Sequence, residues 1–550
     1  MSLIATVLDF LPEILLLAGA LLVFLIDAVG IRRIEVVGSI AVGAILFAML
    51  FVFADLGFAP VAFLATIPPS QIDIVPAVGS TPLYWFTSLG LFFQVFFLIA
   101  AFLVSLASMS RPSRERGAAV FYGMILLATL GMMLVAVASD LIFLLIAIEV
   151  VSIPSYLLVA YTRRDARSME AAMKFFIVGA LSTVLSFFGA SFLYGAYGTT
   201  NLFVLASGSA VSNGAFGGGG FPLLVVIGYC LLIAGLAFKI TLVPFHAWAV
   251  DVYDGAPDDV SAFLAGGTKK IGLFAFFLVF LGPVLLVRGT VEFQWFGGIG
   301  AVALGPVLQV VLSILAVVTM TVGNVLALMQ KSMKRMLAYS SISQAGYMFI
   351  GIAIGTAPAL TGASLQVFAH VFMKTGAFLV VAAAAGLGVG PLIADWRGMG
   401  QRHPWLSVAF ALMLLSLAGV PLTIGFLSKF VLFSAAIEAQ GYFVWLAVAG
   451  LLNSALSVFY YGRVLKVMYF DAPERGSVIP SSTEADVPLP GAPNGRAAVS
   501  PIGLGAGGIG YARATTIALI AIVIVALGVY PGPLLQPLAA AAQHFVNLAF

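Results

Sequence analysis

The chain has 550 residues, of which 62% are hydrophobic and only 9% are charged. Soluble domains typically carry about 25% charged residues, and no water-soluble fold of this size buries so much apolar surface. The composition therefore excludes a soluble protein and indicates that lipid is the solvent. The single cysteine, Cys230, excludes a disulfide within the chain. The net charge of +3 is small and divided among short loops, so nothing indicates a nucleic-acid partner.

A helix needs about 20 consecutive apolar residues to cross the hydrocarbon of a bilayer. Fourteen such runs predict an all-α polytopic membrane protein, and the alternating segments of a membrane β-barrel are not found. The first run has no basic residue ahead of it, so we expect a retained helix and not a cleaved signal peptide. The runs cover 10–30, 34–56, 84–108, 117–137, 140–161, 173–197, 222–244, 259–287, 303–329, 338–356, 363–386, 405–436, 442–469 and 515–535.

The basic residues between the runs predict the orientation. If the N-terminus lies outside, nineteen Lys and Arg fall in odd-numbered connections, and Arg288 alone falls in an even-numbered one. Because positive loops stay in the cytoplasm, we expect a multi-pass protein of the bacterial plasma membrane with its N-terminus outside. The exception is 246–259, an inside loop with several Asp and no Lys or Arg.

Two segments read as flexible connections. The segment 471–513 is rich in Pro, Gly, Ser and Ala and is typical of an extended cytoplasmic linker, and 199–220 is expected to be an outside loop. The linker contains the pattern G-x-G-x-x-G at Gly503, Gly505 and Gly508. No strand precedes it, so the pattern does not indicate a nucleotide site.

The charges inside the predicted helices carry the functional argument. A lysine at a helix centre costs about 2.5–3.5 kcal/mol on insertion scales, unless it faces water or a partner. Snorkelling or a structural ion pair would explain one such lysine near a helix end, but five of them favour a function. The five are Lys239, Lys269, Lys270, Lys374 and Lys429.

Lysine suits proton transfer because burial shifts the pKa of an ammonium readily, whereas arginine stays protonated. Glu149 is the one acid in the middle of an apolar run, and close to a lysine it would stabilise the charged ammonium. A static Glu–Lys pair has the same contacts and differs only in whether it switches. Scattered histidines and the absence of paired-ligand spacing give no metal site.

Two predicted helices, the seventh and the twelfth, look interrupted. Pro244 follows Lys239 by five residues, and Pro421 with Gly425 precedes Lys429. Proline opens a helix, and such a break is tolerated at membrane depth where it is buried in protein or lines a wet cavity. Breaks in corresponding positions indicate inverted repeats, although an ordinary kink is the alternative for either helix alone.

The spacing of the two breaks suggests two five-helix units, helices 4–8 and 9–13. The expected organisation is a three-helix segment at 1–115, a first repeat at 116–288 and a second at 289–470, then the linker 471–513 and a C-terminal helix with its tail at 514–550.

Further candidates lie beside the lysines. His370 and Lys374 are four residues apart and share a helix face, although a histidine satisfied within the bundle is the simpler reading. Lys269 and Lys270 point about 100° apart, so we expect at most one of them on a relay line. His246, close to Pro244, is the remaining candidate.

Three strings carry a resemblance: FKITLVPFHAWAVDVYDGAPDDVSAFLAGGTKK, KRMLAYSSISQAGY and GVPLTIGFLSKF. Together with the N-terminal LPE they resemble the subunit N family of the proton-translocating NADH–quinone oxidoreductase, respiratory complex I. The likeness runs from about 115 to 470, and VYDGAP is closer to subunit N than to the L and M subunits or cation–proton antiporter subunits.

The resemblance implies two inverted five-helix repeats and a proton relay through Glu149, Lys239, Lys269 and Lys429. It does not decide whether Lys270, His370 and Lys374 take part in the relay. It also implies that NADH, FMN, iron–sulfur clusters and quinone bind to other subunits and that this chain holds no cofactor. The implied partners are the antiporter-like M subunit, small membrane subunits and the lipid bilayer.

Three functions compete at this point. The first is an energy-converting subunit whose enzyme activity belongs to the assembly, with no redox centre in this chain. The second is an autonomous cation–proton antiporter, which would be expected to offer a carboxylate-rich ion site. The third is a structural scaffold, which leaves five buried lysines without a role.

Overall fold

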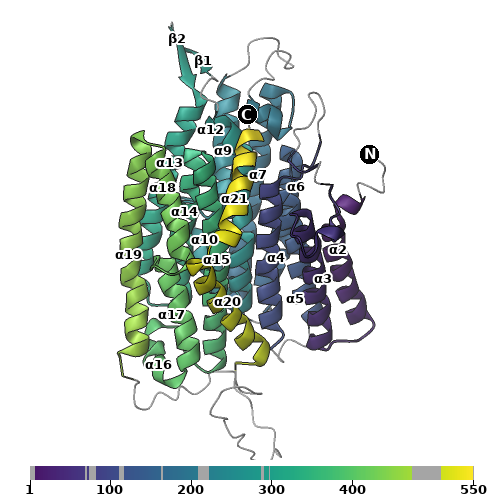
Figure 1. Ribbon diagram of the computed structural model, residues 1–550, viewed down its shortest axis with the longest axis vertical. Coiled ribbons are helices and arrows are strands. Elements are labelled where there is room, and N and C mark those ends of the chain that lie inside the picture. Colours follow the sequence, from purple (N-terminus) through teal and green to yellow (C-terminus); the bar gives the residue numbers. More distant parts are fainter. Residues whose placement is uncertain are drawn as a thin grey trace, which may run out of the picture.

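The computed structural model describes residues 7–68, 71–73, 82–110, 117–162, 165–207, 222–285, 290–295, 298–472 and 509–548. Within these ranges the chain forms a bundle of long helices, most of them roughly parallel to one axis (Figure 1). Arg288 and the three glycines of the G-x-G-x-x-G pattern lie outside the described residues, as does most of 199–220 and 471–513.

The first half of the bundle contains the helices α2 to α12. Their bounds are α2 Leu11–Ala28, α3 Ile34–Asp55, η1 Ala62–Leu64, α4 Ser88–Ser108, α5 Ala118–Ala136, α6 Leu141–Val159, α7 Ala166–Tyr197, α8 Leu202–Ser207, α9 Pro222–Ile240, α10 Ala247–Gly255, α11 Asp258–Phe263, the π-helical turn η5 Leu264–Thr268 and α12 Lys270–Leu285.

The second half begins with a β-hairpin and ends with two helices at the C-terminus. The bounds are β1 Thr290–Trp295, β2 Gly298–Ala303, α13 Leu304–Leu328, α14 Met333–Ile354, α15 Ala357–Gly386, η6 Ile393–Trp396, α16 Met399–Arg402, α17 Pro404–Ala418, α18 Ile424–Glu438, η7 Gly441–Phe443, α19 Val444–Tyr469, α20 Tyr511–Val529 and α21 Gly532–Leu548.

The predicted polytopic helical fold is confirmed. Twelve helices of the described part are long and apolar enough to cross a membrane, and the shorter apolar helices Leu224–Ile240 and Pro404–Ala418 belong to the two segments with predicted breaks. The seventh predicted run ends as a helix at Ile240 and resumes as α10, whereas the twelfth divides into α17 and α18. In Figure 1, α17 and α18 follow each other along the long axis.

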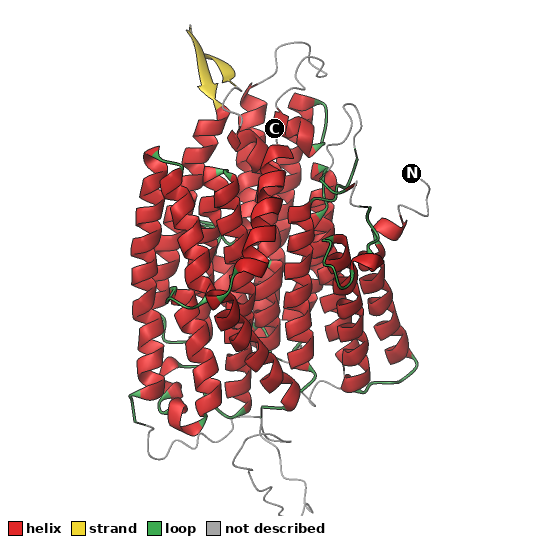
Figure 2. Ribbon diagram, in the orientation of Figure 1, coloured by secondary structure: helices red, strands yellow, loops and turns green. Residues whose placement is uncertain are grey.

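Three elements were not anticipated from the sequence. The hairpin β1–β2 pairs antiparallel, from Thr290 opposite Ala303 to Trp295 opposite Gly298, and projects beyond one end of the bundle (Figure 2). Helix α10 occupies most of the predicted loop 246–259. Helix α21 extends beyond the last predicted run, which stopped at 535. It was missed because its seventeen residues are amphipathic and not apolar throughout.

Burial divides the helices into a core and a periphery. Helices α14 and α15 are almost completely buried: in the most apolar 18-residue stretch of each, 94% and 100% of the stretch lies inside the protein. The corresponding share is only 28% in α19 and in α20. The peripheral helices expose large apolar side chains such as Phe459 and Ile522. In a bilayer such surfaces face lipid or neighbouring subunits. The polar residues in the middle of α14 and α15 are therefore shielded by protein.

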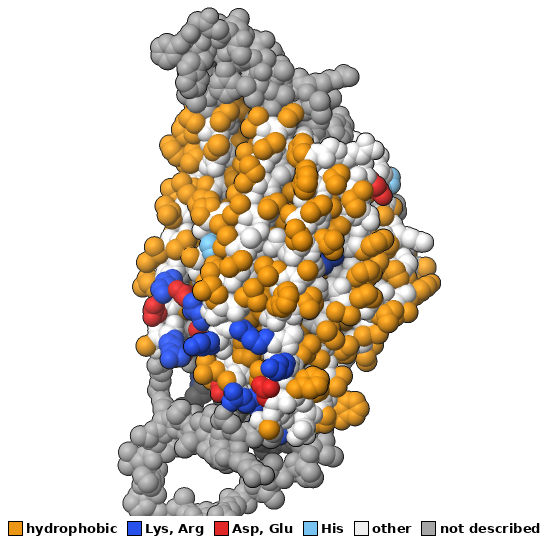
Figure 3. Space-filling view, turned by 90° about the vertical axis from the view of Figure 1, so that its left-hand side faces the viewer, with side chains coloured by type: hydrophobic (Ala, Val, Ile, Leu, Met, Phe, Trp, Pro, Cys, Tyr) orange, Lys and Arg blue, Asp and Glu red, His pale blue; other side chains and the backbone are white. Residues whose placement is uncertain are grey.

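The charged side chains gather at one end of the molecule. On the face shown in Figure 3, most Lys and Arg side chains lie towards the lower end, and apolar side chains cover the middle. Several helices extend into this basic zone beyond the predicted runs. Helix α7 begins at Ala166, seven residues before the predicted run 173–197.

Candidate functional site

The first charged pair joins α6 to α9. Glu149 lies in the middle of α6, and its Oε1 is 3.6 Å from Nζ of Lys239, in the last turn of α9. The side chain of Lys239 is 10% exposed and that of Glu149 is 27% exposed, so both charges are largely removed from solvent. The sequence predicted this pairing only through the family resemblance, and the fold places the two groups together.

Hydroxyl groups complete the surroundings of this pair. Lys239 Nζ donates to Ser152 Oγ over 2.6 Å, and Thr183 Oγ1 donates to Glu149 Oε1 over 2.6 Å. A small cavity lies against the pair and is lined by Ser182 and Ser186 as well. Buried charges need hydrogen-bond partners of this kind, since an unpaired charge at low dielectric is costly.

The helix break lies directly after Lys239. Residues Thr241–His246 leave the helical path before α10 begins, and Val243 N donates to Thr319 Oγ1 of α13 over 3.1 Å. His246 precedes α10, is partly buried, and its Nδ1 has no hydrogen-bond partner among the described residues. Among the described residues, no contact joins His246 to the Glu149–Lys239 pair.

Lys269 and Lys270 follow a π-helical turn and diverge. Lys269 Nζ donates to the Ser341 carbonyl of α14 over 2.8 Å, whereas Lys270 Nζ donates to the Ala265 carbonyl of η5 over 2.6 Å. The widened turn lets one lysine reach α14 while the other stays on its own helix. Only Lys269 thus contacts α14 among these two residues.

Lys374 approaches α14 from a different helix. It lies on α15, donates to the Leu337 carbonyl over 2.8 Å and also bonds Ser340 Oγ. Lys269 and Lys374 are therefore bound by the adjacent residues Ser341 and Ser340. His370, one turn before Lys374, is completely buried, and neither ring nitrogen has a hydrogen-bond partner in the described part of the chain.

Two glycines allow these helices to meet. A Cβ on Gly272 of α12 would lie 2.8 Å from Ile240 N and 3.0 Å from the Lys239 carbonyl carbon, so α12 packs against the end of α9. A Cβ on Gly266 of η5 would collide with Thr375 Oγ1, next to Lys374. Larger side chains at either position would separate the lysine-bearing helices.

Lys429 lies at the break between α17 and α18. Its Nζ donates to the carbonyls of Leu417 and Ala418 over 2.9 and 3.1 Å and to Ser454 Oγ over 2.9 Å. The ring of Tyr347 lies under the ammonium, 4.9 Å from Nζ to the ring centroid. No carboxylate forms an ion pair with Lys429 in the described ranges.

Two glutamines link α15 and α14 to the break that holds Lys429. Gln366 on α15 donates to Gln344 Oε1 over 2.6 Å, and Gln344 Nε2 donates to the Leu417 carbonyl that also binds Lys429. Ser428 Oγ bonds Gln366 Oε1. Sequence reasoning missed these residues and the pair Ser340–Ser341, although clustered polar residues in a buried helix are a usable signal.

The acidic loop that disagreed with the charge rule is neutralised by neighbouring helices. Asp251 of α10 is 2.9 Å from Lys174 Nζ and 3.1 Å from Arg335 Nη1, and Asp258 is 3.0 Å from Lys334 Nζ. The local charge at this end is therefore balanced by basic residues from α7 and α14.

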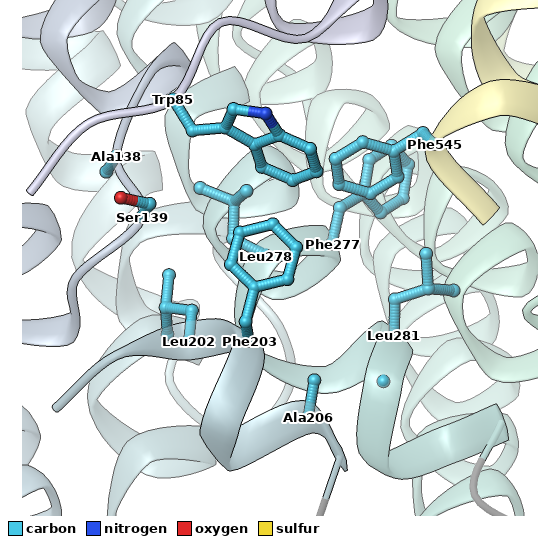
Figure 4. A pocket seen from close by; sticks show the side chains of 11 residues that line it. Trp85, Ala138, Ser139, Leu202, Phe203, Ala206, Phe277, Leu278, Leu281 and Phe545 are labelled. Carbon is cyan, nitrogen blue, oxygen red and sulfur yellow. The ribbon is translucent and has the colours of Figure 1, made fainter. Parts of the chain in front are cut away.

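An apolar pocket lined by no charged residue lies apart from the lysines. Figure 4 shows Trp85, Phe203, Phe277 and Phe545 turned towards one another around it. The nearby Ser139 hydroxyl donates to the Pro82 carbonyl over 2.6 Å and is thereby satisfied. Among the described residues, no group of three or more His, Cys, Asp and Glu is arranged to hold a metal ion.

Known proteins resemble this chain over most of its length. Residues 138–457 match the family described as NADH:quinone oxidoreductase/Mrp antiporter, TM. The chain is 42% identical over 396 residues to the F(420)H(2) dehydrogenase subunit N of Methanosarcina mazei, covering 70% of this chain and 75% of that one. It is 41% identical over 382 residues to the NADH-quinone oxidoreductase subunit N of Trichlorobacter lovleyi, covering 69% and 74%.

Solved structures share the whole architecture. A chain of respiratory complex I from Thermus thermophilus with bound aureothin matches with a TM-score of 0.69 and 26% identity, covering 96% of this chain and 98% of that one. A chain of the Mrp complex from Dietzia sp. matches with a TM-score of 0.75, covering 99% of both chains, and its 19% identity speaks for the fold alone.

Bundle, paired helix breaks and buried lysines define an antiporter-like polytopic membrane subunit. The chain belongs to the NADH:quinone oxidoreductase/Mrp antiporter family. The predicted likeness to subunit N, a membrane-arm subunit of the NADH–quinone oxidoreductase complex, is confirmed.

Proposed function

We propose that this chain moves protons through the membrane arm of a quinone-reducing dehydrogenase complex, along a relay of Glu149, Lys239, Lys269 and Lys429. The observation that carries the proposal is the series of buried ammonium groups, each bound by hydroxyl or carbonyl oxygens. A lysine that exchanges polar partners releases or takes up a proton as its surroundings change.

The roles differ along the line. Glu149 is the switching carboxylate that holds the charge on Lys239, and Lys269 is the central member, reaching α14 where Lys374 also binds. Lys429 is the distal member, connected through Gln344 and Gln366. His370 and Lys374 belong to the centre of the line, whereas Lys270 and His246 stay beside it.

The redox chemistry belongs to the rest of the complex. We propose that NADH, FMN, iron–sulfur clusters and quinone bind to other subunits, and that this chain packs against the antiporter-like M subunit and small membrane subunits. The expected location is the bacterial plasma membrane with the N-terminus outside, supported by the basic end of the bundle (Figure 3). The repeats are assigned to 116–288 and 289–470, between an N-terminal segment at 1–115 and the C-terminal parts 471–513 and 514–550.

Purification of the tagged chain from gently solubilised membranes tests the proposal. We expect other subunits to copurify and the material to oxidise NADH with a quinone, with F420H2 as a second donor because one relative is named for it. When the purified complex is reconstituted into vesicles, the vesicle interior should acidify, and Lys239→Ala should abolish this acidification. A chain that purifies alone and exchanges cations for protons would instead support an autonomous antiporter.

A further inference from the structure

A buried carboxyl group lies outside the relay, in the N-terminal helices. Glu13 is in the first turn of α2 and is only 3% exposed. Its Oε1 accepts a hydrogen bond from Gln94 Nε2 of α4 over 2.7 Å, and the same amide nitrogen lies 3.4 Å from the Met133 carbonyl of α5. Its Oε2 is buried and has no hydrogen-bond partner in the described part of the chain.

The nearby charges do not compensate a carboxylate at this position. The acids Asp55, at the end of α3, and Asp9, four residues before Glu13, belong to the same N-terminal segment. Both are buried acids, at 6% and 3% exposure. The partial positive charge at the start of α2 and the backbone N–H of Glu13 itself favour an anion, but they act on a group with one oxygen unsatisfied.

Asp55 shows what an ionised carboxylate requires in the same surroundings. Its Oδ1 accepts hydrogen bonds from the backbone N–H groups of Thr66 and Ile67 over 2.6 and 3.0 Å, and its Oδ2 accepts one from Thr66 Oγ1 over 3.1 Å. Both oxygens of Asp55 are satisfied, whereas Glu13 has a single side-chain donor. An acidic neighbour and an empty acceptor position both favour a neutral carboxyl group.

We propose that Oε2 of Glu13 is a proton-binding site in the N-terminal segment, separate from the line that runs from Glu149 to Lys429. The ligand is a proton, which bonds to Oε2 and converts the carboxylate to a carboxylic acid without any other reactant. Gln94 keeps Oε1 as the acceptor, so the proton is directed to Oε2. Asp9 lies just before the start of α2 and Asp55 is the last residue of α3, and the proton exchanges with the aqueous phase at that end of the two helices.

Infrared difference spectroscopy of the purified complex tests this site, because a carboxylic acid has a carbonyl stretching band that a carboxylate lacks. The spectra are recorded across a pH titration in H2O and D2O for the parent complex, for Glu13→Gln and for the matched variant Asp55→Asn. We expect Glu13→Gln to lose one deuterium-sensitive acid band that is present at neutral pH. Asp55→Asn should keep that band, although the band should disappear at lower pH than in the parent because the variant removes an acidic neighbour.

Identical spectra for the parent and Glu13→Gln at every pH would overturn the proposal, as would loss of the band in Asp55→Asn alone. Gln94→Leu serves as a second variant, since it keeps the carboxyl group and removes its donor. Its acid band should persist to higher pH than in the parent, and an unchanged titration would contradict the site. The measurement does not depend on proton pumping, so the relay and this site succeed or fail separately.

Discussion

The two helix breaks hold their lysines in different ways. Lys239 lies beside a carboxylate, 3.6 Å from Glu149 Oε1, and has one hydroxyl partner in Ser152. Lys429 has no ion-pair partner in the described chain and binds two carbonyls at the end of α17, together with Ser454. The last carbonyls of a helix are unpaired and carry the negative end of its dipole, so a helix end replaces the carboxylate.

This difference predicts how the lysine at each break would change its protonation state. A full countercharge on a separate helix releases an ammonium when that helix or side chain moves. The carbonyls of α17 precede Lys429 by only a few residues, so a change there requires the break itself to rearrange. The first site is therefore expected to respond to a charge, and the second to the geometry of the break.

The largest expected effect comes from a buried ion pair between α20 and α11. Arg513 of α20 lies 3.0 and 3.2 Å from the oxygens of Asp259 on α11, the helix that leads into Lys269, and both side chains are almost completely buried. Removing one partner of such a pair leaves a buried charge and costs about 3–5 kcal/mol. Arg513→Ala should therefore sharply lower the temperature at which the purified complex loses activity.

The double variant Arg513→Ala with Asp259→Ala is the control for that prediction. It removes both charges, so it should recover a large part of the lost thermal stability. A double variant as unstable as the sum of the two single variants would show that the ion pair itself does not connect α20 to α11.

Replacement of Lys429 by Met is expected to have the next largest effect. The substitution keeps a flexible apolar chain and removes the proton carrier, so proton pumping in vesicles should fall about 100-fold, within the range for loss of an acid–base group. Lys466→Met, at an exposed position of α19, should leave pumping unchanged. Full pumping by Lys429→Met would exclude this lysine from the relay.

Glu149→Gln tests the countercharge of the first site. Two unit charges at about 4 Å interact by about 4 kcal/mol at an effective dielectric constant of 20, and the partial exposure of both groups reduces this to about 2 kcal/mol. We therefore expect a smaller loss, about 30-fold in pumping rate. The exposed Glu438→Gln is the matched control. Equal rates for the two variants would mean that Lys239 does not need its carboxylate.

The smallest effects sharpen the comparison most directly. Ser152→Ala removes the one hydroxyl partner of Lys239, and a net loss of about 1 kcal/mol corresponds to roughly a fivefold slower pump. Ser454→Ala leaves Lys429 with two carbonyls and should change the rate by less than about twofold. The reverse order would show that the helix end does not hold Lys429.

Several features were predictable because they are local. The twelve helices of the described chain that are long enough to cross a membrane were predicted from apolar runs, and the breaks were predicted from Pro244 and Pro421. The end of the chain was not fully predicted, since α21 is too polar for a hydropathy rule and is held by Leu538 and Phe545 packing into the bundle. The polar partners were also missed, because nothing local marks Ser340 or Ser341 as neighbours of a lysine.

The sequence by itself determined that this is a membrane protein, how many apolar runs it has, which two helices are interrupted and which ionisable residues lie inside the helices. Each of these depends on composition or on residues close together in the chain. The tertiary structure alone decided that Lys269 and Lys374 meet at neighbouring serines of α14, and that Lys429 is held by a helix end. The lysine–serine contacts join residues 72 and 34 positions apart in the chain, and the Lys429 contacts span the break between α17 and α18. Only close packing of the helices brings these groups within hydrogen-bond distance.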